Sequence, residues 1–176
     1  MQFSTVLLAA MASGAAMANY NIKLYEHRSC LVKVGKTCSN VGARDCCSDG
    51  GKKYKSAKFA ETGGSGATDQ LKLYKESDCG GLAVEQHTGT SCLSHSEKEI
   101  QGAQVFVVIN TRDEQSAAPS KRVEPDEAFM EDGRFKYTVK RDSPEGKAYD
   151  KLKRVEDQIE HLRTFGKREV IPEDVE

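Results

Sequence analysis

Short runs of alternating apolar and polar residues fill the chain from about residue 20 to residue 110, and glycine-rich turns separate them. This alternation is typical of β-strands that bury one face. A run at 102–109 becomes apolar on both faces, which predicts a strand in the middle of a sheet. No helical period interrupts the pattern here. We therefore predict that residues 19–110 form an all-β domain.

The strand pattern occurs twice. Residues 71–79 repeat residues 22–30 at an offset of 49, with identical Lys, Leu, Tyr and Cys positions. Further along, the segment 102–105 aligns with the segment 56–59, and both are predicted to be strands. Self-similarity of this kind indicates duplicated units that share one core. We place the two repeats at 20–66 and 69–110.

Each repeat resembles the βγ-crystallin Greek-key motif. The features of the motif are a strand ending in Leu-Tyr-Glu, an apolar residue or Cys five residues after the Tyr, a glycine-rich bend, and a Ser or Gly opening a last strand about 30 residues on. The resemblance implies a double Greek-key sandwich in which the Tyr begins a folded hairpin and the Ser ties that hairpin down. By match, Tyr25 and Ser56 take these places in the first repeat, and Tyr74 and Gly102 in the second. Gly102 would leave the second hairpin without a hydroxyl tie.

The family often binds Ca²⁺ through two adjacent Asp or Asn residues shortly before that Ser. Hard oxygen ligands are what Ca²⁺ requires. The equivalent positions here are Lys52 and Lys53 in the first repeat, and Lys98 and Glu99 in the second. A lysine pair repels a dication, so we expect no Ca²⁺ there. We expect no other metal or cofactor either, because there is no C-x-x-C pair and the histidines lack ligand spacing.

The first 18 residues are predicted to be a signal peptide. An apolar stretch from Phe3 to Ala12 is followed by small residues and by the A-x-A site that ends at Ala18. The stretch is shorter than the roughly 20 residues that span a bilayer. No other run approaches that length. We expect a secreted, extracellular chain that starts near Asn19 and has no transmembrane segment.

The cysteines are predicted to form a disulfide framework, because an even number of them in an exported chain is typical of one. All six lie in the β domain. If each repeat is self-contained, Cys79 bonds to Cys92. Adjacent cysteines rarely bridge each other, because the geometry is strained. Cys46 and Cys47 are then expected to bond to Cys30 and Cys38, in either order.

Residues 111–176 differ in composition from the β domain. They hold 14 Lys/Arg and 17 Asp/Glu, no cysteine and few apolar residues, so we predict a charged, partly disordered tail. Apolar residues flank Asp132-Gly133, which favours a hairpin. Ser143-Pro144 opens a predicted amphipathic helix over about 144–165, with Gly166 as its stop. Such a helix is marginal alone. It would dock in cis, pair with another helix, or fold on a partner.

Basic residues suggest two further features. Lys52, Lys53, Lys55 and Lys58 form a locally basic cluster that would be either a solvated edge or a patch for an anionic partner. The net charge of −1 gives no reason to expect nucleic acid. Four Lys-Arg pairs in the tail match the target of kexin-type proteases. They are either chance pairs in a basic segment or processing sites, and the favoured site would be Lys121-Arg122, which lies in a Pro- and Ser-containing linker, whereas the pair at 153–154 falls inside the predicted helix.

No sequence motif of a known catalytic site is present. Glu26, Asp45, Asp49, Glu76 and Asp78 could supply a carboxylate pair for glycoside hydrolysis, although acidic residues in such loops are usually solvated. Without tryptophan, Tyr20, Tyr25, Tyr54 and Tyr74 are the aromatic faces on which sugars could stack. We therefore expect a non-enzymatic effector or toxin-like protein that binds a host or competitor target. A cell-wall or glycan-binding protein and a small hydrolase are the alternatives.

Overall fold

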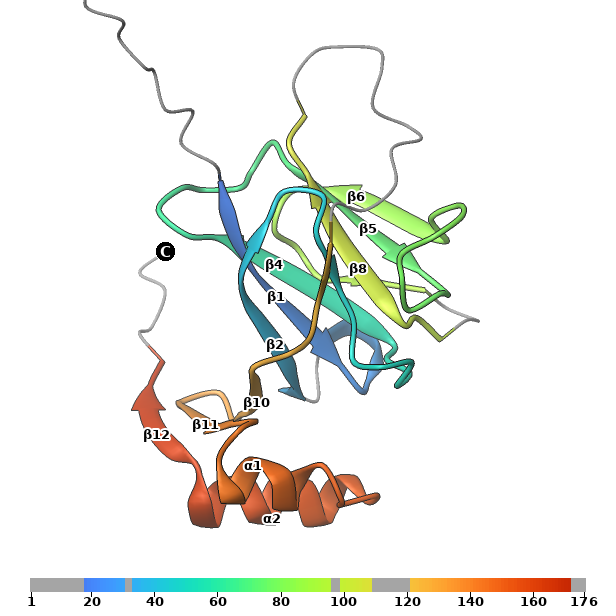
Figure 1. Ribbon diagram of the computed structural model, residues 1–176. Helices are drawn as coiled ribbons and strands as arrows, with labels where there is room; N and C mark the ends of the chain where they lie inside the picture. Colours follow the sequence, from blue (N-terminus) through green and yellow to red (C-terminus); the bar gives the residue numbers. More distant parts are fainter. Residues whose placement is uncertain (1–17, 31–32, 96–98, 109–120, 172–176) are drawn as a thin grey trace, which may run out of the picture.

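The computed structural model describes residues 18–30, 33–95, 99–108 and 121–171. Within these residues the chain is mostly β-structure, arranged in two sheets, with two short helices at the C-terminal side (Figure 1). The predicted signal peptide lies outside the described residues, apart from Ala18.

The first sheet begins with the first repeat. Strands β1 (Asn19–Tyr25), β2 (Lys33–Gly42) and β4 (Ser56–Glu61) are antiparallel neighbours, with β1 in the middle. The second repeat builds the other sheet in the same way from β5 (Gln70–Tyr74), β6 (Glu85–Thr88) and β8 (Gly102–Phe106). Each predicted repeat thus contributes a three-stranded antiparallel unit with its first strand in the middle.

Each repeat also gives a fourth, short strand to the sheet of the other repeat. Strand β3 (Cys46–Cys47) comes from the first repeat but pairs with β8, whereas β7 (Leu93–Ser94) comes from the second repeat but pairs with β4. The two repeats thus exchange one strand each. Neither can form its complete sheet without the other.

The main core lies between the two sheets. Ile22 and Leu24 of β1 share one core cluster with Leu71 and Leu73 of β5, and all four side chains are fully buried. This is the alternation that the sequence predicted, with the apolar positions of each strand turned inward. Burying a side chain of this kind contributes about 1.5–3 kcal/mol.

Residues beyond 120 extend both sheets, which corrects the prediction that the tail is separate from the β domain. Strand β9 (Arg122–Val123) pairs in parallel with β3, and β10 (Glu127–Glu131) adds to the free edge of β2. β11 (Phe135–Lys140) and β12 (Lys167–Val170) continue the first sheet to seven strands. The hairpin predicted at Asp132-Gly133 is confirmed, and Gly133 supplies the positive φ of 90° that its turn requires.

The predicted single helix over 144–165 is two helices. Helix α1 (Pro144–Tyr149) begins as expected, with the Ser143 side chain accepting a hydrogen bond from the Gly146 backbone and Pro at the first turn. Helix α2 (Val155–Phe165) follows after a break at 150–154. Both helices pack on β10 and β11.

A second apolar core forms under the helices. The buried side chains of Val34, Met130, Val139, Tyr149 and Leu162 bring β2, β10, β11, α1 and α2 together. Val34 and Lys36 lie on the same face of β2 as Cys38, which belongs to the main core. The helices therefore cover the same face of the seven-stranded sheet as the second sheet does. The helix thus docks in cis, which was one of the arrangements expected.

Candidate functional site

The disulfides differ from the predicted pairing. Cys30 bonds to Cys92, Cys46 bonds to Cys79, and Cys38 bonds to Cys47. The bond expected between Cys79 and Cys92 is wrong, and Cys46 bonds to neither Cys30 nor Cys38. Cys38–Cys47 is one of the bonds left open by the sequence. As expected, the adjacent cysteines do not bond to each other.

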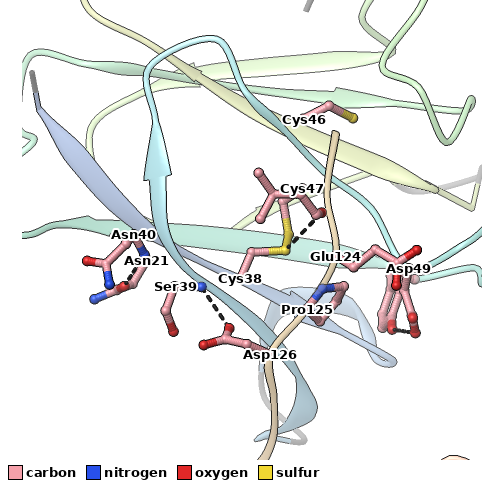
Figure 2. The surroundings of a disulfide bond; sticks show 12 residues. Asn21, Cys38, Ser39, Asn40, Cys46, Cys47, Asp49, Glu124, Pro125 and Asp126 are labelled. Carbon is pink, nitrogen blue, oxygen red and sulfur yellow. Dashed lines mark hydrogen bonds between the residues drawn. A yellow bond between two sulfur atoms is a disulfide. The ribbon is translucent and has the colours of Figure 1, made fainter. Parts of the chain in front are cut away.

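Strand exchange is the physical reason for this connectivity. Cys30 and Cys79 occupy the same place in the two hairpins, while Cys46 lies on β3 and Cys92 directly precedes β7. Because β3 and β7 have crossed to the other sheet, each hairpin cysteine faces the exchanged strand of the opposite repeat. Two disulfides therefore link the repeats. The third joins β2 to β3 across the sandwich, beside the tail segment that leads into β10 (Figure 2).

The first hairpin is tied by Ser56. Its hydroxyl donates a hydrogen bond to the His27 carbonyl at 2.7 Å and accepts one from the Cys30 amide at 3.3 Å. Ser56 is fully buried, and it sits opposite Tyr25 in the β1–β4 register. The hydroxyl therefore satisfies backbone groups of the turn that follows Tyr25.

The second hairpin has no room for such a hydroxyl. A Cβ atom at Gly102 would lie 2.6 Å from the Cys79 sulfur and 2.9 Å from the Glu76 carbonyl oxygen. The Cys46–Cys79 disulfide occupies the space that a side chain would need. Glycine at 102 is therefore required by close approach, and the sulfur bridge holds the turn that a Ser would otherwise hold.

Replacing Ser56 by alanine is expected to lower the free energy of unfolding by about 0.5–1.5 kcal/mol, because the half-buried His27 and Cys30 backbone groups would lose their partner. Ser65→Ala is the matched control, since Ser65 lies in an exposed turn. Denaturant unfolding of both variants checks this. Equal midpoints for the two would contradict the role of Ser56.

Ion pairs occupy three of the positions at which the sequence resemblance would place calcium ligands. Lys52 pairs with Glu26 at 2.6 Å, and Lys53 pairs with Glu99 at 2.7 Å. Lys98 lies outside the described residues. Two of the four lysines of the predicted basic cluster are thus paired with carboxylates, which leaves Lys55 and Lys58 as its remaining members.

We predict that Ca²⁺ does not stabilise the protein, because three of the four positions carry ammonium groups and the one carboxylate, Glu99, is paired with Lys53. The melting temperature measured with and without Ca²⁺ should be the same. A rise of several degrees at micromolar metal would contradict the prediction. Mg²⁺ at the same concentration is the control for non-specific ionic effects.

A strongly charged cleft lies where the tail meets the β domain. It has a volume of about 410 Å³ and is lined by Glu26, Lys36, Asp49 and Lys52 from the β domain and by Arg141, Asp150, Leu152, Lys153 and Gln158 from the tail. Opposite charges from both parts of the chain meet in it. The cleft is thus the junction between the two regions.

Asp49 is the centre of this charge cluster. Lys36 reaches it at 2.8 Å, Arg141 at 3.1 Å, and the Tyr54 hydroxyl donates to it at 2.8 Å. Asp150 contacts both cations, at 2.5 Å from Lys36 and 3.3 Å from Arg141. The side chains of Lys36 and Asp49 are only 4% and 5% exposed. Two buried charges are therefore neutralised by each other and by tail residues.

The pKa of Asp49 follows from this environment. Burial on its own raises the pKa of the carboxyl, but the hydrogen bond and charge of Lys36, helped by Tyr54 and Arg141, outweigh it and hold the pKa below its ordinary value. Asp49 is therefore ionised at neutral pH. An ionised carboxylate cannot act as a general acid, so in a glycoside hydrolysis scheme Asp49 would be the nucleophile or base.

The lowered pKa of Asp49 predicts acid-sensitive stability. Because the folded pKa lies below the unfolded one, Asp49 stabilises the fold fully above its unfolded pKa of about 3.9. This contribution is lost as the pH falls through the folded pKa. We expect the stability difference between the wild type and Asp49→Asn to shrink below about pH 4 in urea unfolding. A difference that stays constant down to pH 2 would contradict this.

Another pocket lies in the second repeat, at the edge of the second sheet. It has a volume of about 520 Å³ and is lined by Lys72 and Tyr74 of β5, by the loop 81–84, and by Glu85 and Gln86 of β6. Leu82 in that loop is 93% exposed. Within the described residues, β6 is the last strand of this sheet and is mostly exposed. An open strand edge thus lies beside a pocket and an exposed apolar side chain.

The tyrosines proposed for sugar stacking are all in the interior. Tyr20, Tyr25 and Tyr54 are at most 1% exposed, and Tyr74 is 5% exposed. The Tyr20 hydroxyl donates to Asp69 at 2.9 Å, and burial raises the pKa of this phenol well above its ordinary value. These rings are core residues and offer no open face to a glycan.

A family model matches residues 21–127 of the chain, and its description is the ARB_05566_N N-terminal domain. The chain belongs to the ARB_05566_N family. The ARB_05566_N match runs past the domain end predicted at 110 and reaches the first residue of β10. It therefore includes both repeats and β9. Comparison with curated proteins and with solved structures gave no match.

Among the described residues, neither helix is long and apolar enough to cross a membrane. In the same residues no group of His, Cys, Asp and Glu is arranged to hold a metal ion. Sequence reasoning missed the Lys36–Asp49 cluster. A signal for this cluster was present in the sequence. Lys36 lies between Val34 and Cys38 on the inward-facing side of β2, where an apolar residue would be expected.

Proposed function

We propose that this protein is a secreted, non-enzymatic binding protein of the effector or toxin-like kind, acting on a host or competitor target. Its three disulfides support an extracellular location, because disulfides persist in oxidising compartments. The A-x-A site at 16–18 supports export.

The exchange of β3 and β7 supports a βγ-crystallin-like double Greek key for the two repeats. The hydrogen bonds of Ser56 to the first hairpin agree with the role that the resemblance implies for that residue. On this proposal the disulfide-linked sandwich is a rigid frame, and recognition lies on its loops and edges.

The pocket beside β6 is the observation that carries the binding proposal. An exposed strand edge can add an extended segment of a partner through backbone hydrogen bonds, and an adjoining pocket can select its side chains. Leu82 would supply the apolar contact, while Glu85 and Gln86 offer polar groups at the pocket wall. A protein segment therefore fits this surface better than a sugar, since Tyr74 is buried.

The test uses labelled, purified protein applied to intact cells of candidate hosts and competitors. We expect wild-type protein to bind and to inhibit growth or evoke a response, and Leu82→Glu to lose both. Val170→Glu is the matched control, because Val170 is 68% exposed on β12, far from β6. Equal behaviour of both variants would refute the assigned surface.

Two further outcomes separate the alternatives. Retention on chitin or glucan particles, without any effect on cells, would favour a cell-wall or glycan-binding protein. Hydrolysis of a polysaccharide that is abolished by Asp49→Asn or Glu26→Gln would favour an enzyme. Intact mass spectrometry of culture fluid tests export itself, with a chain starting near Asn19 as the expected result.

A further inference from the structure

The break between α1 and α2 places one Lys-Arg pair in an exposed connection. Lys153 and Arg154 are both exposed, and the Arg154 side chain is 71% accessible. The backbone of Arg154 is extended, with φ −95° and ψ 138°. Proteases bind their substrates as extended strands, so this conformation matches what a protease requires. The single helix predicted from sequence would have hidden the pair.

The other three Lys-Arg pairs are held by strand pairing or by the charge cluster. At Lys121-Arg122, the Lys121 carbonyl accepts a hydrogen bond from the Cys46 amide at 2.8 Å, and Arg122 belongs to β9. Arg141 is bonded into the charged cleft through Asp49. The pair at 167–168 lies in β12, which is paired with β11 along its length.

The start of α2 is weakly fixed. Arg154 is its N-cap residue, and no side chain caps the helix there. A missing cap leaves backbone amides of the first turn without partners and costs about 0.5–2 kcal/mol of helix stability. The first turn of α2 can therefore open at low cost. Opening it would present a longer extended segment around Arg154 to a protease.

We propose that Lys153-Arg154 is a processing site for a dibasic-specific serine endoprotease of the secretory pathway. The proposal rests on the export proposed above. Water adds across the peptide bond between Arg154 and Val155, leaving a carboxylate on Arg154 and an ammonium group on Val155. Lys153-Arg154 replaces Lys121-Arg122 as the preferred processing site.

The cut frees the segment that contains α2 and β12. Residues 155–176 hold no cysteine, so no disulfide retains them. Within α2 only Gln158 and Leu162 are fully buried, and all four residues of β12 are exposed. A helix of 11 residues is marginal by itself. Its loss would expose the second core around Tyr149 and open the charged cleft, which Lys153 and Gln158 line.

The site is tested on the purified, oxidised protein with a kexin-type protease. Denaturing mass spectrometry over time should show first cleavage after Arg154, and size exclusion should show the new C-terminal fragment separating from the rest. Arg154→Gln is expected to slow this cut at least tenfold. Arg122→Gln and Arg168→Gln are the matched controls, and both should be cut after Arg154 at the wild-type rate.

Initial cleavage at any other pair, or no cleavage after Arg154, would overturn the proposed site. A cut protein that keeps its fragment through size exclusion would overturn the release. The purified-protein experiment does not depend on export. Export is judged separately, by whether any form of the chain reaches the culture fluid, and cutting in the cell is judged by the mass of that form.

Discussion

Replacing Asp49 by alanine is expected to lower the free energy of unfolding by about 3–5 kcal/mol. The substitution leaves the Lys36 ammonium, only 4% exposed, without its closest buried carboxylate. Asp150 remains as its other partner, but that side chain is 30% exposed and is also bonded to Arg141. The Tyr54 hydroxyl would lose its acceptor as well. A buried charge and a buried hydroxyl would thus be left with too few partners.

Asp157→Ala is the matched control for this prediction. Asp157 also pairs with an arginine, but its side chain is 46% exposed and the distance to Arg154 is 3.8 Å. Exposed pairs contribute about 0–1 kcal/mol. Urea unfolding of both variants measures the two losses in the free energy of unfolding. A loss below about 1 kcal/mol for Asp49→Ala would mean that water or side-chain movement solvates the cluster.

The charge cluster also explains why the tail folds onto the β domain. Lys36 and Asp49 lie on the β domain side, while Arg141 and Asp150 come from the tail. Lys23 of β1 adds a further link, since it pairs with Glu131 of β10 and lies over the Phe129 ring at 5.1 Å. A highly charged segment can therefore be ordered when its charges have fixed partners. Composition alone predicted disorder because it does not report those partners.

The local features of the fold could be predicted from the sequence, because they depend on neighbouring residues. Alternation in β1 and β5, the Asp132-Gly133 turn and the Ser143-Pro144 helix start are of this kind. The break between the helices was missed, since the apolar stripe continues through Leu152 and Val155. Both of these side chains are only partly buried.

The long-range features could not be predicted in the same way. A repeat in sequence does not reveal whether its units keep their own strands or exchange them. The predicted bond between Cys79 and Cys92 assumed that each repeat keeps its own strands. In the structure β3 and β7 are exchanged between the repeats. Gly102 carried a usable signal. A glycine where the first repeat has Ser56 indicated that something else fills the space, and that is the Cys46–Cys79 bridge.

Strand exchange makes the two inter-repeat disulfides strong determinants of stability. Cys30–Cys92 spans 62 residues and Cys46–Cys79 spans 33. By loop-closure entropy, removing such a bond costs about 4 kcal/mol. We therefore expect Cys30→Ala/Cys92→Ala to lower the free energy of unfolding by this amount, measured by denaturant unfolding. A loss under about 1 kcal/mol would show that the exchanged strands hold the repeats together without the bond.

Single substitutions test the connectivity on which this estimate depends. Cys79→Ala should leave the thiol of Cys46 free, and alkylation followed by peptide mapping would find the label there. If each repeat were self-contained, the label would appear on Cys92 instead. Cys30→Ala should in turn free Cys92. We expect the label on Cys92 in the Cys30 variant and on Cys46 in the Cys79 variant. This result is possible only if each hairpin is bonded to the strand that it receives from the other repeat.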